Sequence, residues 1–333
     1  MIHVALAVYD PKGTYSRHAG VVMVTIFEHT KRYVCIHILH DGTLTGQNRA
    51  FLGEIANSFE QTVEFHDVSD CMESIGDVAL ELSEKWSRGT LFRLFIQDII
   101  PQSKMIYLDC DILITMDIGE LWDIPLENHS LAGVLDRPGD KPFRIFSAKA
   151  FRCFLMRCDR KSYVNAGVLL MDLDRIRKNY NLIQQGVIWF KLYRHCAELV
   201  DQDLINSCFC KDIKIIKSRF NSTLCYGNIS NMILHARAHP KPWNGLEGSE
   251  LERIYWKTYL KTPWGRLSRD EIIDVMLDVV KDSAYTHRRM SRCYKNVFNR
   301  LRRDIGRSDI LKITLLLVND IYHRLRRGFA REG

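Results

Sequence analysis

The chain has 333 residues, of which 46% are hydrophobic and 26% charged, as in an ordinary globular protein. This composition excludes an intrinsically disordered chain, whose apolar content would not build a core. The first ten residues are largely apolar and have no basic segment before them, so they predict a buried strand and not a signal peptide. No apolar run reaches the ~18 residues that span a bilayer. The ten cysteines form no paired motif, so we expect reduced thiols in a cytoplasmic protein.

The net charge of +7 is concentrated at the carboxyl end of the chain. Residues 281–333 contain 14 Lys and Arg against five Asp and Glu, so the preceding 280 residues sum to −2. Near the end, an apolar helical stripe leads into Arg324, Arg326 and Arg327. This pattern is typical of a helix on an anionic membrane surface, and equally of a helix packed on a domain with a solvated basic face. We expect no nucleic-acid binding, because no known module or aromatic interleaving accompanies the arginines.

Strand-like and helix-like segments alternate from the first residue. Apolar, β-prone runs predict strands at residues 2–9, 34–39, 63–68, 104–114, 130–138, 163–173, 213–216 and 231–235. Helical spacing predicts helices at residues 18–27, 45–59, 87–100 and 174–179, at the segment from 199, and beyond 247. The alternation predicts an α/β sheet, in which ligands bind beyond the carboxyl ends of the strands. Asp10 and the loop after it lie at that edge.

Two aspartates interrupt the apolar run 104–114. In an extended backbone, Asp109 and Asp111 project to the same side, and two adjacent carboxylates repel each other unless a cation lies between them. The same Asp-x-Asp pattern occurs twice more. At residues 172–174 capping of a helix explains it, and at residues 201–203 the cap and the helix dipole explain at least one carboxylate. The pair at 109 and 111 is therefore the candidate for a hard divalent cation that also holds a phosphorylated ligand.

A loop after the last predicted strand carries residues that suit the same ligand. His235 offers an imidazole as a third metal ligand, and Lys241 lies between two prolines, where it could meet a phosphate as a point charge. The alternative for each is a satisfied loop histidine and a solvated lysine. Arg93 lies among apolar residues of a predicted helix, which leaves an inward, ligand-facing role and a surface role equally open.

Four motifs in the same order and at suitable spacing resemble glycosyltransferase family 8. The family comprises retaining, metal-dependent transferases, including bacterial lipopolysaccharide galactosyl- and glucosyltransferases and glycogenin. The resemblance covers roughly residues 1–245. The motifs are Tyr107-Leu-Asp-Cys-Asp-Ile-Leu113, Asn165-Ala-Gly-Val-Leu-Leu-Met-Asp-Leu173, Asp201-Gln-Asp203, and His235 with Lys241-Pro-Trp243.

The resemblance implies a GT-A fold, in which a Rossmann-like, mostly parallel central sheet is flanked by helices. The catalytic domain would span residues 1–246, and residues 247–333 would form a basic helical extension. The family's metal ligands fall on Asp109, Asp111 and His235, which would hold Mn²⁺, with Mg²⁺ as the alternative. The ion would bridge the two phosphates of a UDP-sugar.

The remaining site residues also follow from the resemblance. Lys241 would contact the diphosphate, and Asp10 and Tyr15 would face uridine. Asp201 and Gln202 would position the donor sugar and stabilise its positive charge during a front-side attack. The other residues implied around the donor are Arg93, Cys110, Asp136, Asn165 and Ala166.

The implied reaction transfers a hexose, glucose or galactose, from a UDP-sugar to a saccharide or lipid-linked acceptor in surface polysaccharide or lipopolysaccharide synthesis. A protein acceptor is the alternative. The enzyme would be cytoplasmic, or peripheral on the inner face of the membrane through its basic helices. Two positions depart from the family pattern. Residue 238 is alanine where the family's His-x-x-Gly-x-x-Lys-Pro-Trp loop has glycine, and the first loop is longer than usual.

Overall fold

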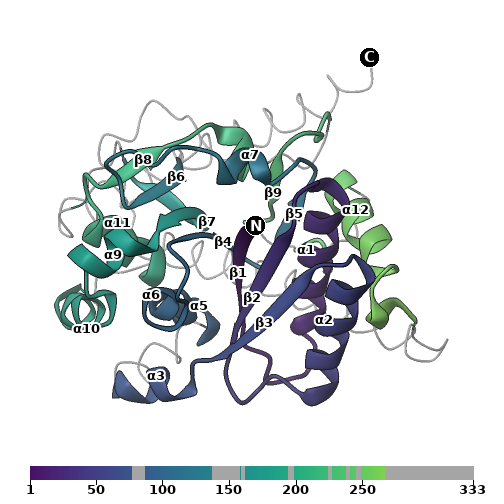
Figure 1. Cartoon of the computed structure of the whole chain (residues 1–333), viewed down its shortest axis with the longest axis horizontal. Coiled ribbons are helices and arrows are strands. Elements are labelled where there is room, and N and C mark those ends of the chain that lie inside the picture. Colours follow the sequence, from purple (N-terminus) through teal and green to yellow (C-terminus); the bar gives the residue numbers. More distant parts are fainter. Residues whose placement is uncertain are drawn as a thin grey trace, which may run out of the picture. The chain divides into compact units, whose positions relative to one another are not determined.

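The computed structural model describes residues 1–76, 87–136, 158, 162–193, 199–223, 227–237, 241–244 and 249–266. Seven strands form a central sheet in the order β3-β2-β1-β4-β7-β6-β8 (Figure 1). Their bounds are β1 Ile2–Val8, β2 Val34–His40, β3 Thr62–Asp67, β4 Lys104–Leu108, β6 Leu131–Leu135, β7 Val164–Asp172 and β8 Ile213–Ile215. A separate two-stranded sheet pairs β5, Ile112–Ile114, with β9, Ile233–His235.

The central sheet is mostly parallel, as predicted. Strands β1 to β4 run parallel to one another, and β6 runs parallel to β8. Only β7 is antiparallel, to both β4 and β6. The register pairs Leu108 with Val168, so the carboxyl end of β4 meets the amino end of β7. Residues 109 and 165–167 are thereby brought to one edge of the sheet.

Helices cover both faces of the sheet (Figure 1). The helices and 3-10 turns are α1 Ser16–His29, α2 Gly46–Ser58, α3 Ser69–Ser74, α5 Gly89–Phe92, η1 Arg93–Phe95, α6 Ile96–Ile99, α7 Gly119–Trp122, α9 Leu173–Asn179, α10 Leu182–Tyr193, α11 Val200–Cys208, η2 Ser218–Asn221, α12 Glu250–Tyr259 and η3 Pro263–Arg266. Alternate residues of β1 enter different cores. Val4 and Leu6 pack with residues of α1, α2 and α12, whereas Ala5 and Ala7 pack with residues of α5, η1 and α11.

Side chains at the helix starts explain several boundaries. Thr45 accepts a hydrogen bond from the backbone N–H of Asn48, and Ser249 accepts one from Glu252. Asp172 accepts one from Arg175 and so begins α9. Each side chain satisfies an N–H that has no partner within its helix.

Two predicted elements are interrupted. The run 104–114 is not one strand: its backbone leaves the central sheet after the bond from Asp109 N–H to the Gly167 carbonyl. It then joins β9, where the Ala236 N–H donates to the Asp111 carbonyl. The predicted helix 87–100 is divided by the 3-10 turn η1, at which the Arg93 Nε donates to the carbonyl of Thr90, 3.3 Å away. Both interruptions fall on predicted site residues.

Helix α12 and the turn η3 follow residue 246 in the chain. Leu251 and Tyr255 of α12, with Trp264 of η3, belong to the same core as the apolar residues of α1. The domain boundary at residue 246 stays a prediction, and residues 267–333, with the basic tail, lie outside the described residues. Among the residues described, no helix is both long and apolar enough to cross a membrane.

Candidate active site

A cavity of about 340 Å³ opens at the carboxyl ends of β1 and β4. Its walls come from β1, the first loop, the segment 87–93, the end of β4 and the segment 241–244. The lining residues are Ala7, Tyr9, Tyr15, Ser87, Gly89, Thr90, Arg93, Tyr107, Asp109, Cys110, Asp111, Lys241, Trp243 and Asn244. This is the edge at which α/β sheets bind ligands. The cavity therefore collects predicted site residues from four separate parts of the chain.

Three potential metal ligands converge beside the cavity. Asp109, Asp111 and His235 each offer one ligand atom, and the three atoms lie within 4.8 Å of one another. The Nε2 atom of His235 is 3.2 Å from Asp111 Oδ1 and 3.8 Å from Asp109 Oδ2. Asp111 Oδ1 is buried and has no hydrogen-bond donor among the residues that the structure describes. An orphaned carboxylate oxygen of this kind fits a cation, since burying it without a partner is costly.

A contact with Asn221 orients the imidazole of His235. Its Nδ1 is 3.0 Å from Asn221 Oδ1, which can only accept, so Nδ1 carries a proton and Nε2 is the nitrogen that faces the two aspartates. A side chain at residue 167 would destroy this arrangement. A Cβ on Gly167 would lie 2.2 Å from His235 Cε1 and 2.6 Å from Asp109 Oδ2.

Cations hold the oxygens of the two aspartates that point away from the cluster. Asp109 Oδ1 accepts from Arg93 Nη2 at 2.8 Å and from the Tyr107 hydroxyl at 3.0 Å. Asp111 Oδ2 accepts from Lys241 Nζ at 2.6 Å. Burial favours a higher pKa for Asp111, but His235 and Lys241 outweigh burial and lower its pKa below the usual value. Each carboxylate thus keeps one oxygen for a metal.

Arg93 is buried at the centre of the site, so its side chain points inward and not toward the surface. Its Nη1 donates to the Ala166 carbonyl at 2.7 Å and lies 3.2 Å from Asp201 Oδ2. Its guanidinium lies 4.3 Å from the centre of the Tyr107 ring. Burial raises the pKa of Asp201 in spite of the opposing effect of Arg93. Arg93 therefore joins β4, β7 and α11 at the cavity.

Gln202 is fixed at both ends of its amide. Its Oε1 accepts from Asn165 Nδ2 at 2.8 Å and from the Ala166 N–H at 3.1 Å. Its Nε2 donates to Asp136 Oδ2 at 3.1 Å, and Arg237 donates to the other oxygen of Asp136 at 3.0 Å. The network fixes the amide of Gln202 at the amino end of β7.

Asp10 has a clear role in the first loop. Its carboxylate accepts from the backbone N–H groups of Tyr15 and Ser16, the hydroxyl of Ser16 and the amide of Asn48. It therefore ties the first loop to the start of α1. Tyr15 lines the cavity directly, whereas Asp10 does not. The contact of either residue with uridine stays a prediction.

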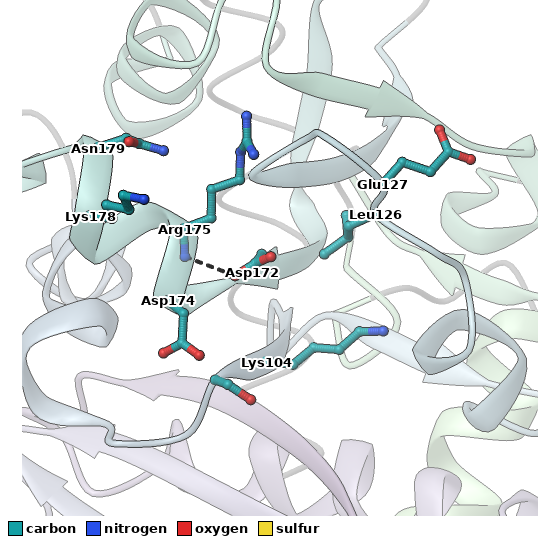
Figure 2. A pocket seen from close by; sticks show the side chains of 9 residues that line it. Lys104, Leu126, Glu127, Asp172, Asp174, Arg175, Lys178 and Asn179 are labelled. Carbon is teal, nitrogen blue, oxygen red and sulfur yellow. Dashed lines mark hydrogen bonds between the residues drawn. The ribbon is translucent and has the colours of Figure 1, made fainter.

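Asp203 and Asp172, from the other two Asp-x-Asp patterns, are hydrogen-bonded to groups of the protein. Asp203 accepts from the Tyr163 hydroxyl at 2.5 Å and the Leu199 N–H at 2.9 Å. Asp172 caps α9 at a polar hollow of about 750 Å³, shown in Figure 2. That hollow also includes Lys104, at the start of β4, so it lies at the edge opposite to Asp109. Lys104 donates to two backbone carbonyls of the chain, those of Trp122 and Ile124.

Sequence reasoning gave no role to several residues that support the site. Asn221 fixes His235, and Arg237 binds both Asp136 and Asn221. Tyr107 belongs to the motif of residues 107–113, and that motif was the available signal that its hydroxyl serves the site by binding Asp109. No local pattern distinguishes Asn221 from a surface asparagine, since its partners are far away in the chain. Position 238 lies outside the described residues.

The comparisons with known proteins identify the family and the fold. The model of the glycosyl transferase family 8 matches residues 7–246. The chain is 26% identical to general stress protein A of Bacillus subtilis, over 78% of this chain and 94% of that protein. It is 27% identical to a Haemophilus influenzae protein over 63% of this chain, but the match spans only 60% of that protein.

Among solved structures, the galactosyltransferase LgtC, in complex with donor and acceptor sugar analogues, matches with a TM-score of 0.65 and 21% identity. That match covers 81% of this chain and 98% of LgtC, and it gives the fold as GT-A. The chain belongs to glycosyltransferase family 8 and is a glycosyltransferase.

Proposed function

We propose that the protein transfers a hexose, glucose or galactose, from a UDP-sugar with retention of the anomeric configuration, and that Asp109, Asp111 and His235 hold the Mn²⁺ ion it requires. The observation that carries this proposal is the convergence of two carboxylate oxygens and one imidazole nitrogen, with the orphaned Asp111 Oδ1 among them. A set dominated by carboxylate oxygens suits Mn²⁺ or Mg²⁺, and the imidazole favours Mn²⁺. When bound, the ion would neutralise the negative charge that develops on a departing diphosphate.

Lys241 and Arg93 are cations that contact the two aspartates of the cluster. Lys241 Nζ bonds Asp111 and the carbonyl of Ala236, so its charge is placed beside the cluster. A fixed positive group stabilises developing charge without reorganising during the reaction. Arg93 contacts Asp109, Ala166 and Asp201, which suits a residue that positions other residues of the site.

The side chains at the sugar end favour front-side attack. Double displacement requires a nucleophile, but the amide of Gln202 is a poor one, and Asp201 is paired with Arg93. In the front-side route, Gln202 and Asp201 would orient the sugar and stabilise its positive charge. Asp136, Asn165 and Ala166 would hold Gln202 in position.

An assay of UDP release tests the metal assignment. Asp109→Asn combined with Asp111→Asn should abolish the release of UDP that depends on Mn²⁺. Asp172→Asn combined with Asp174→Asn is the matched control, because it changes the same pattern at the opposite edge of the sheet. Equal turnover by the wild type and the first double variant would contradict the assignment.

Lys241→Ala separates a catalytic from a binding role. If Lys241 stabilises developing charge, kcat should fall by about 10²-fold. A rise in KM with kcat unchanged would mean that Lys241 contributes only uniform binding. Assays with UDP-glucose, UDP-galactose and their N-acetyl forms would identify the donor.

For the acceptor, we propose a saccharide or a lipid-linked saccharide, reached from the cytoplasmic face of the membrane in surface polysaccharide or lipopolysaccharide synthesis. The net charge of +9 over residues 281–333 supports an attraction to anionic lipid. Sedimentation with vesicles that contain anionic lipid, compared with neutral vesicles, tests this. Sedimentation that is equal with both kinds of vesicle would contradict it.

A further inference from the structure

A second cluster of metal-binding side chains lies away from the cavity, on the parallel strands β1, β2 and β3. His3, Cys35 and His37 come together there, and so do His37, Glu64 and His66. His37 is central to both sets and is fully buried. The register places His37 opposite Glu64, and Glu64 and His66 share one face of β3 because they are two residues apart.

We propose that His37, Glu64 and His66 bind a second metal ion, of the class that prefers imidazole ligands, with Zn²⁺ as its representative. The ligand atoms would be His37 Nδ1, His66 Nε2 and Glu64 Oε2. His37 Nδ1 and His66 Nε2 are hydrogen-bonded at 2.9 Å, and they lie 3.4 and 3.7 Å, respectively, from Glu64 Oε2; a bound ion would take the place of the shared proton. A tetrahedral ion with bonds of about 2.0–2.1 Å separates its ligands by about 3.3–3.4 Å. The three distances bracket this value.

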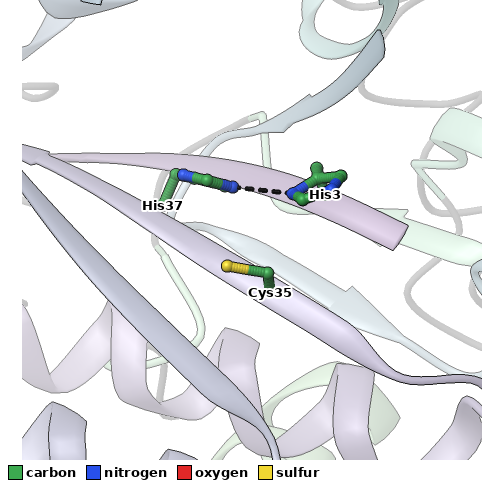
Figure 3. Close-up of side chains that lie close together, drawn as sticks. All are labelled: His3, Cys35 and His37. Atoms are coloured by element: carbon green, nitrogen blue, oxygen red, sulfur yellow. Dashed lines mark hydrogen bonds between the residues drawn. The ribbon is translucent and has the colours of Figure 1, made fainter. Parts of the chain in front are cut away.

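Neighbouring side chains orient two of the three donors, His37 and Glu64. His37 Nε2 faces His3 Nδ1 at 2.9 Å, and Figure 3 shows the two rings directed toward each other. A proton on His37 Nε2 leaves the lone pair on Nδ1, and the partner of the other ring nitrogen usually fixes a histidine ligand in this way. The Cys35 thiol donates to Glu64 Oε1 at 3.6 Å, so Oε2 is the oxygen that faces both histidines.

The protonation states of these groups agree with this ligand set. Burial, with His66 and His3 nearby, lowers the pKa of His37 to about 3, and burial also lowers the pKa of His66. Both rings are therefore neutral at pH 7, as metal ligands must be. His3, Cys35 and His37 form the alternative ligand set.

The metal preference of this site would differ from that of the active site. Two imidazoles and one carboxylate suit Zn²⁺, and they leave a fourth position for water. The side chain of Glu64 is 45% exposed, so solvent reaches the cluster from β3. Since β3 is an edge strand of the central sheet, the ion would fasten it to β2.

Metal titration of a chain without a histidine tag tests the proposal. The protein is first treated with a chelator, and Zn²⁺ binding is then measured by calorimetry in the Asp109→Asn and Asp111→Asn background, which disables the active-site ligands. We expect one bound Zn²⁺ per chain and a melting temperature raised by a few degrees at saturation. Co²⁺ should give the visible absorption of a tetrahedral site.

Two further variants in this background identify the ligands. Glu64→Gln combined with His66→Asn should weaken Zn²⁺ binding at least 100-fold, whereas His29→Asn, at an exposed histidine of α1, should leave it unchanged. In the otherwise wild-type chain, the Glu64 and His66 changes should preserve UDP release, which shows that the fold is intact. Zn²⁺ binding that survives these changes would overturn the proposal. So would binding that is lost in Cys35→Ala and retained in Glu64→Gln, because it would place the ion at His3, Cys35 and His37.

Discussion

Asp109 and Asp111 each divide their carboxylate between two partners. One oxygen of each binds a cation of the chain, Arg93 or Lys241, and the other faces His235. This division limits the repulsion between the two aspartates and fixes the direction of the free oxygens. A site whose ligands are held by further partners binds its metal more tightly, because less order is lost on binding.

Gly167→Ala tests how closely this cluster is packed. The added methyl group would overlap His235 and Asp109, so Mn²⁺ affinity should fall by about 10–100-fold. Gly53→Ala, in α2, is the control, because no atom of the described residues lies within 4 Å of its Cβ position. Mn²⁺-dependence curves for UDP release measure the effect. Identical curves for Gly167→Ala and the wild type would contradict the described position of His235.

Asn221→Ala tests the support of His235. Without the acceptor on Nδ1, the imidazole would lose its fixed orientation and proton position. The Mn²⁺ concentration for half-maximal activity should rise by about 10-fold or more. Asn179→Ala, at an exposed position of α9, should behave as the wild type. An unchanged half-maximal concentration in Asn221→Ala would show that the Asn221 contact does not position the ring.

At the residue scale, the sequence predicts those side chains whose chemistry is recognisable in a motif, and the structure brings four of them together: Asp109, Asp111, His235 and Lys241. The sequence does not reveal Asn221 or Arg237, because their roles arise from contacts with residues distant in the chain. An asparagine that fixes a histidine has the same local pattern as one that faces solvent.

At the scale of elements, an aromatic stack anchors the segment that carries Lys241. Trp243 lies on His18 of α1, with ring centres 3.7 Å apart, and the Nδ1 of His18 is 2.6 Å from the hydroxyl of Tyr255 in α12. The stack joins two helices to the segment 241–244. It therefore helps to hold the Lys241 side chain beside Asp111.

His18→Phe should reduce the loss of stability in mild acid. Burial and Arg17 hold the pKa of His18 well below its usual value, so the native ring stays neutral while the unfolded ring binds a proton below about pH 6.5. Stability is therefore complete above this pH and falls as the pH falls. Between pH 7.5 and 5.5 the wild type should lose about 1.4 kcal/mol more than His18→Phe. Urea unfolding at both pH values measures the difference, with His29→Phe as the control. An equal loss in the wild type and His18→Phe would contradict the neutral state of His18.

Most elements follow from apolar periodicity, which predicts the strands and helices near the amino end of the chain within a few residues. The run 104–114 could not be divided correctly from periodicity, because it stays hydrophobic while its strand partner changes from β7 to β9. A single-sequence pattern contains no information on which strand pairs with which. The helices α3, α7 and α10 were not predicted, and of these α3 and α7 are too short to show a period.

At the scale of the whole molecule, the site links the central sheet to the small sheet. Asp109 follows β4, whereas Asp111 precedes β5 and His235 ends β9. An ion between them would join elements from both sheets. A ligand that binds only the native state stabilises it by mass action.

Mn²⁺ together with UDP should therefore raise the melting temperature. At concentrations about 100 times the Kd, the stabilisation is about 2.7 kcal/mol, which corresponds to a shift of a few degrees. Differential scanning calorimetry measures this shift. It should be absent in His235→Ala, and a shift of equal size in that variant would place the ion elsewhere.

The most direct test of the central claim is a titration of Mn²⁺ followed by electron paramagnetic resonance in the presence of UDP. The wild type should bind one Mn²⁺ per chain, and Asp111→Asn should bind it at least 10-fold more weakly. Equal Mn²⁺ affinity in the wild type and Asp111→Asn would contradict the assignment of Asp109, Asp111 and His235 as the metal site.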